Sequence, residues 1–141
     1  MTEQRTRIAR QFIEAIPHAR ALGMQLDAVG DGVAELSMAY DERFIGDPST
    51  GVIHGGAVFA LMDTCCGAAV MNHATGAAGT ATLDLRIDYM RPATPGQRIR
   101  TRAECYHVTR TVAFVRATAT DDDDARPVAT ASAAFTVERA T

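Results

Sequence analysis

The chain has 141 residues, a length typical of one compact domain, and we expect a single domain over residues 1–141. Fourteen Lys and Arg residues against 17 Asp and Glu residues give a net charge of −3, and the basic residues are scattered. That balance argues against a nucleic-acid partner. The longest apolar run, residues 55–71, is interrupted by Asp63, so we expect no membrane span or membrane partner.

The N-terminal segment and the cysteines indicate the cellular compartment. The first ten residues, MTEQRTRIAR, carry charge from the third position and lack the apolar core of an export signal, so we expect a cytoplasmic protein. The three cysteines are odd in number and show no CxxC spacing, and we interpret them as small buried hydrophobic residues. The histidines show no metal-ligand spacing, so no metal is expected.

The first third of the sequence alternates short elements with turns. Apolar residues at near-helical spacing in residues 3–16, followed by a proline, predict an amphipathic helix, and we interpret residues 1–17 as a helical lid segment. Two apolar-rich runs, residues 24–29 and 33–40, flank a Gly-Asp-Gly triplet and predict a β-hairpin. Residues 41–53 contain several Gly and Pro residues and predict an irregular loop.

The rest of the chain predicts one long helix and a run of strands. Residues 55–73 are apolar around their whole circumference, which is typical of a helix buried on all sides. Residues 81–90 alternate apolar and polar side chains and predict a strand with one buried and one polar face. Three further β-rich runs joined by tight turns predict an antiparallel meander: residues 98–108, 111–120 and 127–138.

The fold class follows from the long helix. A helix that is apolar on every side needs a sheet that curls around it, because a flat sheet covers one face only. We therefore expect an α+β fold in which a curved antiparallel sheet wraps a central helix. The aspartates at 121–124 are expected at an exposed hairpin tip, since a calcium loop would need spaced ligands and a turn glycine.

The candidate chemistry lies at the start of the long helix. His54 precedes Gly55 and Gly56, whose N–H groups lie at the positive end of the helix dipole and could polarise a bound carbonyl; alternatively, the glycines only let another segment come close. Asp63 is the only charged residue of the helix, and the cost of burying a carboxylate marks it as a functional candidate. The alternative is a structural hydrogen bond to a threonine, Thr64 or Thr82. His54 could bind a ligand carbonyl, orient the loop or act as a base.

Helix geometry constrains how these groups can cooperate. At a rise of 1.5 Å per residue, Gly55 and Asp63 are about 12 Å apart along one helix. A carbonyl under attack needs its N–H donor and the attacking oxygen each about 3 Å away. If both groups act on one carbonyl, they come from two antiparallel copies of the helix, which predicts two sites at a two-fold dimer interface.

These residues resemble a known family. The segment 51–67, followed by the strand segment 80–93, is similar to the PaaI-type acyl-CoA thioesterases of the hotdog-fold superfamily, and the similarity extends over residues 22–137. It rests on His-Gly-Gly followed within the helix by Asp63, and on a strand ending in Tyr-x-x-Pro. The resemblance implies a sheet wrapped around a central helix, homodimers with joined sheets that often pair into homotetramers, and hydrolysis of an acyl- or aryl-CoA without a cofactor.

The resemblance also implies roles for single residues. Gly55 would donate its N–H to the thioester carbonyl, and Asp63 of the other subunit would act as nucleophile or general base. Thr82 would orient water or the carboxylate. Many members carry an Asn shortly before the Gly-Gly pair, but here the loop is one residue longer and has no Asn, so Asp47 or Ser49 is the expected substitute.

Further substrate contacts are expected from the coenzyme A moiety and the acyl chain. Arg91 and Arg110 are candidates for the phosphates of coenzyme A, although each is equally a solvated surface charge. Phe59 and Met62 are candidates for the acyl pocket and are equally ordinary core residues.

Two other functions are weighed against the thioesterase. A hotdog enoyl-CoA hydratase would use an Asp and His pair as base and acid, an arrangement that His54 before the glycine pair does not resemble. A non-enzymatic acyl-CoA-binding module would bind ligand without turnover. Asp63 argues against such a module, because a binding protein has no need of a costly buried carboxylate.

Overall fold

The structure, a computed structural model, describes residues 2–140. The helical elements are α1 (Thr2–Ala15), α2 (Pro17–Ala21), the 3₁₀ turn η1 (Glu42–Phe44) and α3 (Gly55–Met71). The strands are β1 (Met24–Gly30), β2 (Val33–Met38), β3 (Ile45–Asp47), β4 (Val52–Ile53), β5 (Thr82–Tyr89), β6 (Ile99–Val108), β7 (Val112–Thr120) and β8 (Ala129–Thr136). Six strands form an antiparallel sheet in the order β1-β2-β6-β7-β8-β5, and β3 pairs with β4 alone.

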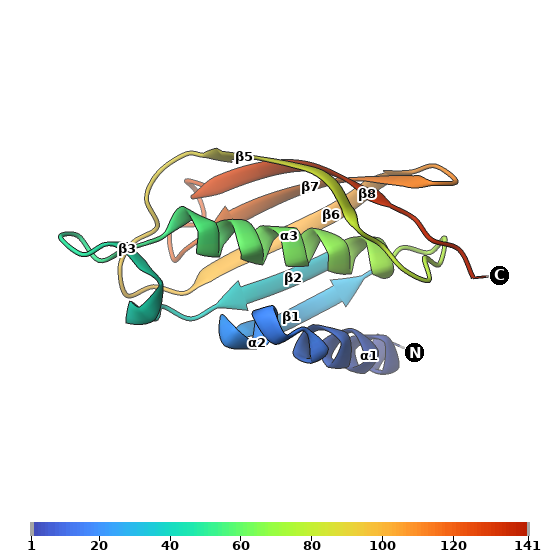
Figure 1. The fold of residues 1–141 in the computed structure, drawn as a ribbon, viewed down its shortest axis with the longest axis horizontal. Helices are drawn as coiled ribbons and strands as arrows, with labels where there is room; N and C mark the ends of the chain where they lie inside the picture. The colour runs from blue at the N-terminus through green and yellow to red at the C-terminus, as the bar shows by residue number, and fades with distance from the viewer. Residues whose placement is uncertain (1, 141) are drawn as a thin grey trace.

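The long helix lies along one face of this sheet, mainly against β2, β6 and β7 (Figure 1). The inward positions of β7 and β8 are rich in small buried side chains: Ala113, Ala117, Ala119, Ala129, Ala131 and Ala133. Small side chains on a strand let a helix approach closely without leaving voids. The expected central helix against an antiparallel sheet, including the meander β6-β7-β8, is confirmed.

Two short segments are more ordered than their composition predicts. Pro17 follows the first helix but opens the second, because proline at the first helical position loses no hydrogen bond. The predicted irregular loop contains η1 and the β3–β4 hairpin. The turn of that hairpin closes where the Gly51 N–H donates to the Asp47 carbonyl at 2.8 Å, with Gly51 at φ +79°, a conformation that favours glycine.

A β-bulge changes the faces of β5. Thr82 lies opposite Phe135 while Asp84 lies opposite Ala134, so Leu83 is an extra residue in the strand. The strict alternation predicted from the sequence is therefore wrong at this point. The bulge turns the Thr82 side chain toward the helix instead of placing it on the polar face with Asp84.

The predicted burial of one β5 face is also wrong within this protomer. β5 ends the sheet and pairs with β8 only, so its other edge is unpaired. Leu83 is 57% exposed and Tyr89 51% exposed, although both are large apolar side chains. Nothing within residues 2–140 covers this edge, which leaves unpaired backbone groups beside an apolar surface.

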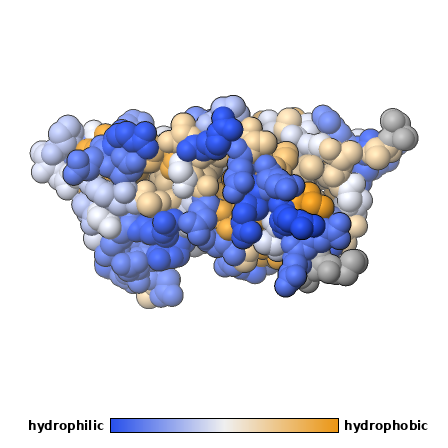
Figure 2. Space-filling view, turned by 90° about the horizontal axis from the view of Figure 1, so that it is seen from below, coloured by the Kyte–Doolittle hydropathy of each residue, from blue (hydrophilic) through white to orange (hydrophobic). Residues whose placement is uncertain are grey.

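The opposite edge of the sheet has a different character. α1 and α2 lie beside β1 (Figure 1), where Ala9 and Ile13 of α1 are buried. Figure 2 views the molecule from this side: hydrophilic side chains cover most of it, and apolar ones show in small separate areas. Among the helices of residues 2–140, none has the length and apolar character to cross a membrane.

The aspartate run is only partly exposed, contrary to the prediction, because Asp121 is buried. Both terminal nitrogens of the Arg91 guanidinium donate to its carboxylate, at 2.7 and 2.8 Å, and the N–H groups of Thr94 and Asp123 each donate at 3.0 Å. The Arg91 hydrogen bonds hold the pKa of Asp121 well below its usual value. This clasp joins the β5–β6 connection to the β7–β8 turn.

We expect Asp121→Asn to lower the free energy of unfolding by about 3 kcal/mol at pH 7, because it leaves the Arg91 charge without its partner. Because folding lowers the pKa of this carboxyl, its contribution is complete above pH about 4 and is lost as the pH falls further. Urea unfolding at pH 7 and pH 3 measures both effects. Asp122→Asn, at an exposed pair with Arg100, is the control and should change stability by less than about 1 kcal/mol. Equal losses from both variants would contradict the assignment.

Candidate active site

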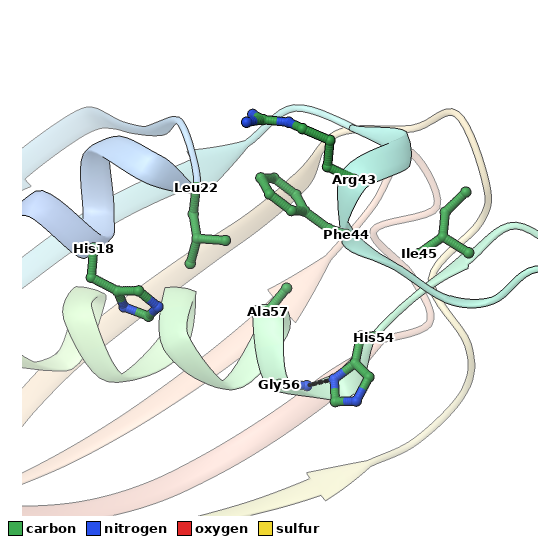
Figure 3. A pocket seen from close by; sticks show the side chains of 8 residues that line it. All are labelled: His18, Leu22, Arg43, Phe44, Ile45, His54, Gly56 and Ala57. Atoms are coloured by element: carbon green, nitrogen blue, oxygen red, sulfur yellow. Dashed lines mark hydrogen bonds between the residues drawn. The ribbon is translucent and has the colours of Figure 1, made fainter.

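The start of α3 is organised by His54. The Nδ1 atom of its ring accepts the Gly56 N–H at 2.8 Å, so the side chain caps the helix (Figure 3). A Cβ atom on Gly56 would lie 2.9 Å from this Nδ1, which explains the second glycine. With Nδ1 as acceptor, the neutral ring carries its proton on Nε2.

One N–H group at this helix end stays free. The His54 carbonyl accepts the Ala57 N–H at 3.0 Å, and Gly56 is used by the His54 ring. Within residues 2–140, the Gly55 N–H has no hydrogen-bond partner. This unpaired donor lies at the positive end of a 17-residue helix, where it favours a partial negative charge such as a carbonyl oxygen.

Asp63 is not fully buried, contrary to the expectation. The sheet covers one side of α3 and leaves an open stripe along the helix, formed by Gly56, Phe59, Ala60, Asp63, Thr64 and Gly67. The Thr82 hydroxyl donates to Oδ1 of Asp63 at 2.7 Å. Oδ2 has no partner within the described residues and is available to accept a proton or to attack.

Tyr89 is the residue that sequence analysis missed. Its hydroxyl donates to the Gly55 carbonyl at 2.7 Å, and its ring would contact a Gly55 Cβ at 3.4 Å. The alternation of β5 had marked Tyr89 as a buried apolar position, and only the Tyr-x-x-Pro ending of the strand singled it out. β5 therefore makes two side-chain hydrogen bonds to α3: Thr82 to Asp63, and Tyr89 to Gly55.

The predicted substitutes for the missing Asn lie on the β3–β4 turn, which projects at one end of the molecule (Figure 1). The N–H and hydroxyl of Ser49 donate to Oδ1 of Asp47 at 3.0 and 2.7 Å. These hydrogen bonds lower the pKa of Asp47. Within this protomer, Asp47 and Ser49 bond to each other and not to Gly55.

The other predicted substrate contacts lie in different places. Arg91 is engaged by Asp121 and also lines a hollow beside Gly55. Arg110 lies in the β6–β7 turn, at the end of the sheet beyond the last turn of α3 (Figure 1). Met62 is fully buried in the core, whereas Phe59 is 39% exposed on the open stripe. Among residues 2–140, no three His, Cys, Asp or Glu side chains gather in a way that could hold a metal ion.

Two hollows flank the start of α3. One, of about 310 Å³, lies on the α2 side and is lined by the residues labelled in Figure 3, including Leu22, Phe44 and His54. The other, of about 430 Å³, lies between Gly55 and the end of β5 and has a mostly apolar lining that includes Val58 and Tyr89. Both volumes fall in the range of small-molecule sites.

Comparison with known proteins identifies the family. The Thioesterase superfamily profile matches residues 50–128, more than half of the chain, and this span contains the start of α3, Asp63 and β5. The chain belongs to the thioesterase superfamily. The resemblance found in the sequence is thereby confirmed.

Several known proteins are similar to this chain in sequence or in fold. The medium/long-chain acyl-CoA thioesterase YigI of Escherichia coli K12 is 26% identical over 122 residues, which cover 77% of this chain and 78% of YigI. A Pseudomonas aeruginosa protein of known structure is 40% identical with a TM-score of 0.83, covering 94% of this chain and 98% of that one. The Escherichia coli PaaI protein of the phenylacetic acid degradation operon shares the fold, with a TM-score of 0.87, 19% identity and coverage of 99% and 97%.

The cysteines of this thioesterase-superfamily chain lie in the core. Cys65, Cys66 and Cys105 are all buried, and the Cys65 thiol is 3.3 Å from the Ala34 carbonyl oxygen. Burial raises the pKa of Cys65 to about 12 and also raises the pKa values of Cys66 and Cys105. A thiol with so high a pKa carries almost no thiolate at neutral pH and is a poor nucleophile.

We therefore expect the three thiols of the folded protein to resist a thiol reagent such as dithionitrobenzoate at pH 8. The absorbance of the released thiolate measures the reaction, and the same protein in 6 M guanidinium, with all three thiols exposed, is the control. Reaction of a thiol in the folded protein as fast as in the unfolded protein would contradict the burial of that cysteine.

Proposed function

We propose that this chain hydrolyses acyl-CoA thioesters, with the Gly55 N–H polarising the thioester carbonyl and Asp63 supplying the base or nucleophile. The observation that carries the proposal is the unpaired Gly55 N–H at the positive end of α3, on the same helix as a carboxylate held by Thr82. Membership of the thioesterase superfamily supports the reaction class. The name of YigI supports medium and long acyl chains as the first substrates to test.

We further propose that the complete site lies between two copies of the chain. Gly55 and Asp63 are about 12 Å apart along α3, too far to act on one carbonyl from a single helix. Two features support a homodimer: the unpaired β5 edge with exposed Leu83 and Met90, and the open α3 stripe with exposed Phe59. Antiparallel pairing of two β5 edges would join the sheets and bring the Asp63 of one copy toward the Gly55 of the other. Pairing of two such dimers into a homotetramer is a further prediction.

The chemistry then needs few groups. The carbonyl oxygen accepts the Gly55 N–H, which stabilises the negative charge that develops on this oxygen. Asp63 of the second copy takes a proton from water through Oδ2 as the water oxygen bonds to the carbonyl carbon. The tetrahedral intermediate collapses, the C–S bond breaks, and coenzyme A leaves as a thiolate. A thiol pKa of about 8.5 makes this departure easy without a dedicated acid.

A second route uses the same geometry. Oδ2 of Asp63 attacks the carbonyl carbon itself, coenzyme A leaves, and water then cleaves the mixed anhydride. A single turnover in H₂¹⁸O separates the routes: direct attack by water labels the released acid, whereas water attack on the Asp63 carboxyl carbon of the anhydride labels the enzyme. Thr82 serves both routes, because its hydroxyl occupies Oδ1 and leaves Oδ2 free.

We expect Asp63→Asn to lower kcat about 100- to 10,000-fold while the dimer stays intact. Free-thiol release from short, medium, long and aromatic acyl-CoAs measures the effect, with mass determined by light scattering. Asp27→Asn, which removes an exposed carboxylate from the β1 bulge, is the control and should retain full activity. An unchanged rate of thiol release in Asp63→Asn would overturn the mechanism. Binding of acyl-CoA without turnover would favour a binding module. Loss of enoyl-CoA absorbance without thiol release would favour a hydratase.

The location of the site between subunits has its own test. Gly55→Pro removes the N–H at a position where proline suits a helix, and the backbone of His54, at φ −58° and ψ 135°, is compatible with a following proline. Gly55→Ala keeps the N–H and is the control. Each of Gly55→Pro and Asp63→Asn alone should retain only a small residual turnover, about a hundredth of the wild-type value or less. Co-expressed at equal levels, they should regain about a quarter of wild-type turnover, because half of the dimers are hybrids with one intact site. No recovery would place both groups in one protomer.

A further inference from the structure

Each end of β5 donates one side-chain hydrogen bond to the candidate site. At one end, Thr82 holds the carboxylate of Asp63; at the other, Tyr89 holds the backbone of Gly55. The resemblance to known thioesterases implies a role for Thr82 but none for Tyr89.

The site depends on the direction of one N–H bond. A site with two N–H donors constrains the carbonyl oxygen from two sides, but here Gly56 and Ala57 are already paired within the helix start. Of the N–H groups of Gly55, Gly56 and Ala57, only that of Gly55 is left to donate to the carbonyl oxygen. The strength of a hydrogen bond falls steeply as its angle departs from linear. A small rotation of the peptide between His54 and Gly55 would therefore weaken the interaction with the substrate.

Glycine makes such a rotation easy, because Gly55 has no side chain that packs against its surroundings. Tyr89 supplies the missing constraint. Its hydroxyl holds the carbonyl of Gly55 at 2.7 Å, and its ring stands 3.4 Å from the position of a Cβ atom, so one face of the glycine is in contact with the ring. The His54 ring holds the same peptide through its Gly56 N–H. The preceding peptide, which carries the Gly55 N–H, is held through the His54 carbonyl, which accepts the Ala57 N–H. These contacts together restrain the peptides on both sides of the Gly55 Cα.

Tyr89 itself is held firmly for an edge-strand residue. The next two N–H groups of the chain, those of Met90 and Arg91, donate to the Val128 carbonyl at 2.8 and 3.3 Å. The Arg91 side chain then enters the clasp with Asp121. These contacts anchor the backbone that follows Tyr89 to the folded core.

We propose that Tyr89 is a positioning residue for thioester hydrolysis, acting through the Gly55 carbonyl to aim the Gly55 N–H at the thioester oxygen. The proposal rests on the proposed thioesterase function. An interaction that strengthens mainly in the transition state changes kcat and leaves KM nearly unaltered. Removal of the Tyr89 hydroxyl should therefore lower kcat about 10-fold and change KM by less than about twofold.

The test uses Tyr89→Phe in the full-length protein, which removes the hydroxyl and keeps the ring. Tyr106→Phe is the matched control, because Tyr106 is a half-exposed tyrosine of β6 whose ring lies 4.0 Å from the Arg116 guanidinium. Both variants are also made in the Gly55→Pro background, where no N–H remains to be aimed. Steady-state kinetics with the best acyl-CoA of the panel gives kcat and KM, and light scattering gives the dimer mass.

The double variant separates positioning from general structural support. If Tyr89 acts through the Gly55 N–H, its substitution has no further effect once that N–H is gone. A residue that only stabilises the fold would lower the residual activity of Gly55→Pro by the same factor as it lowers that of the wild type. Selective ¹⁵N-glycine labelling of the eleven glycines adds a second readout, in which Tyr89→Phe should shift the Gly55 amide signal and Tyr106→Phe should not.

Each outcome decides the proposal. A 10-fold loss of kcat in Tyr89→Phe that vanishes in the Gly55→Pro background supports it. An unchanged kcat, an equal loss in both backgrounds, or loss of the dimer overturns the role of Tyr89 and leaves thioester hydrolysis standing. A wild-type protein that hydrolyses no acyl-CoA overturns the proposed function, and the role of Tyr89 in hydrolysis falls with it.

Discussion

The fold depends on removing the apolar surface of α3 from water. The 17 residues of this helix include a single charged side chain. Such a helix is unstable in water, because its hydrophobic surface extends around the whole circumference. The six-stranded sheet solves part of this problem by presenting alanine-rich strands to one side of the helix. What the sheet does not reach is the open stripe, and Asp63 lies within it. The incomplete cover therefore exposes the candidate carboxylate, and it is the reason for proposing a second copy of the chain as the partner.

The backbone of α3 is as important as its side chains. A helix N-terminus normally leaves several N–H groups without partners. Here the ring and the carbonyl of His54 satisfy two of them and leave the Gly55 N–H. Because His54 occupies the N–H groups of Gly56 and Ala57, the proposed thioester carbonyl would accept its hydrogen bond from Gly55.

Features that follow from local patterns could be predicted from the sequence. The long apolar helix, the meander and the placement of the glycine pair and Asp63 on one helix belong to this group, since periodicity and helix geometry determine them. The β5 bulge could not be predicted, because an extra residue in a strand shows only in its pairing with β8. The burial of Asp121 was missed for a related reason, since its partner Arg91 lies 30 residues away in the chain. Tyr89 resembled a core residue because strand alternation describes which face a side chain takes and not which backbone atom its hydroxyl reaches.

The two side chains of β5 that donate hydrogen bonds to α3 differ in length, and this difference determines the space between strand and helix. A threonine hydroxyl is attached directly to Cβ, so Thr82 can bond to Asp63 only where strand and helix run close together. A tyrosine hydroxyl lies beyond an aromatic ring, so Tyr89 spans a wider separation to Gly55. The separation between α3 and β5 therefore increases from the Asp63 carboxylate toward the Gly55 N–H (Figure 1). The apolar hollow of about 430 Å³ lies at this wider end, so the length of the Tyr89 side chain sets the size of the space beside Gly55.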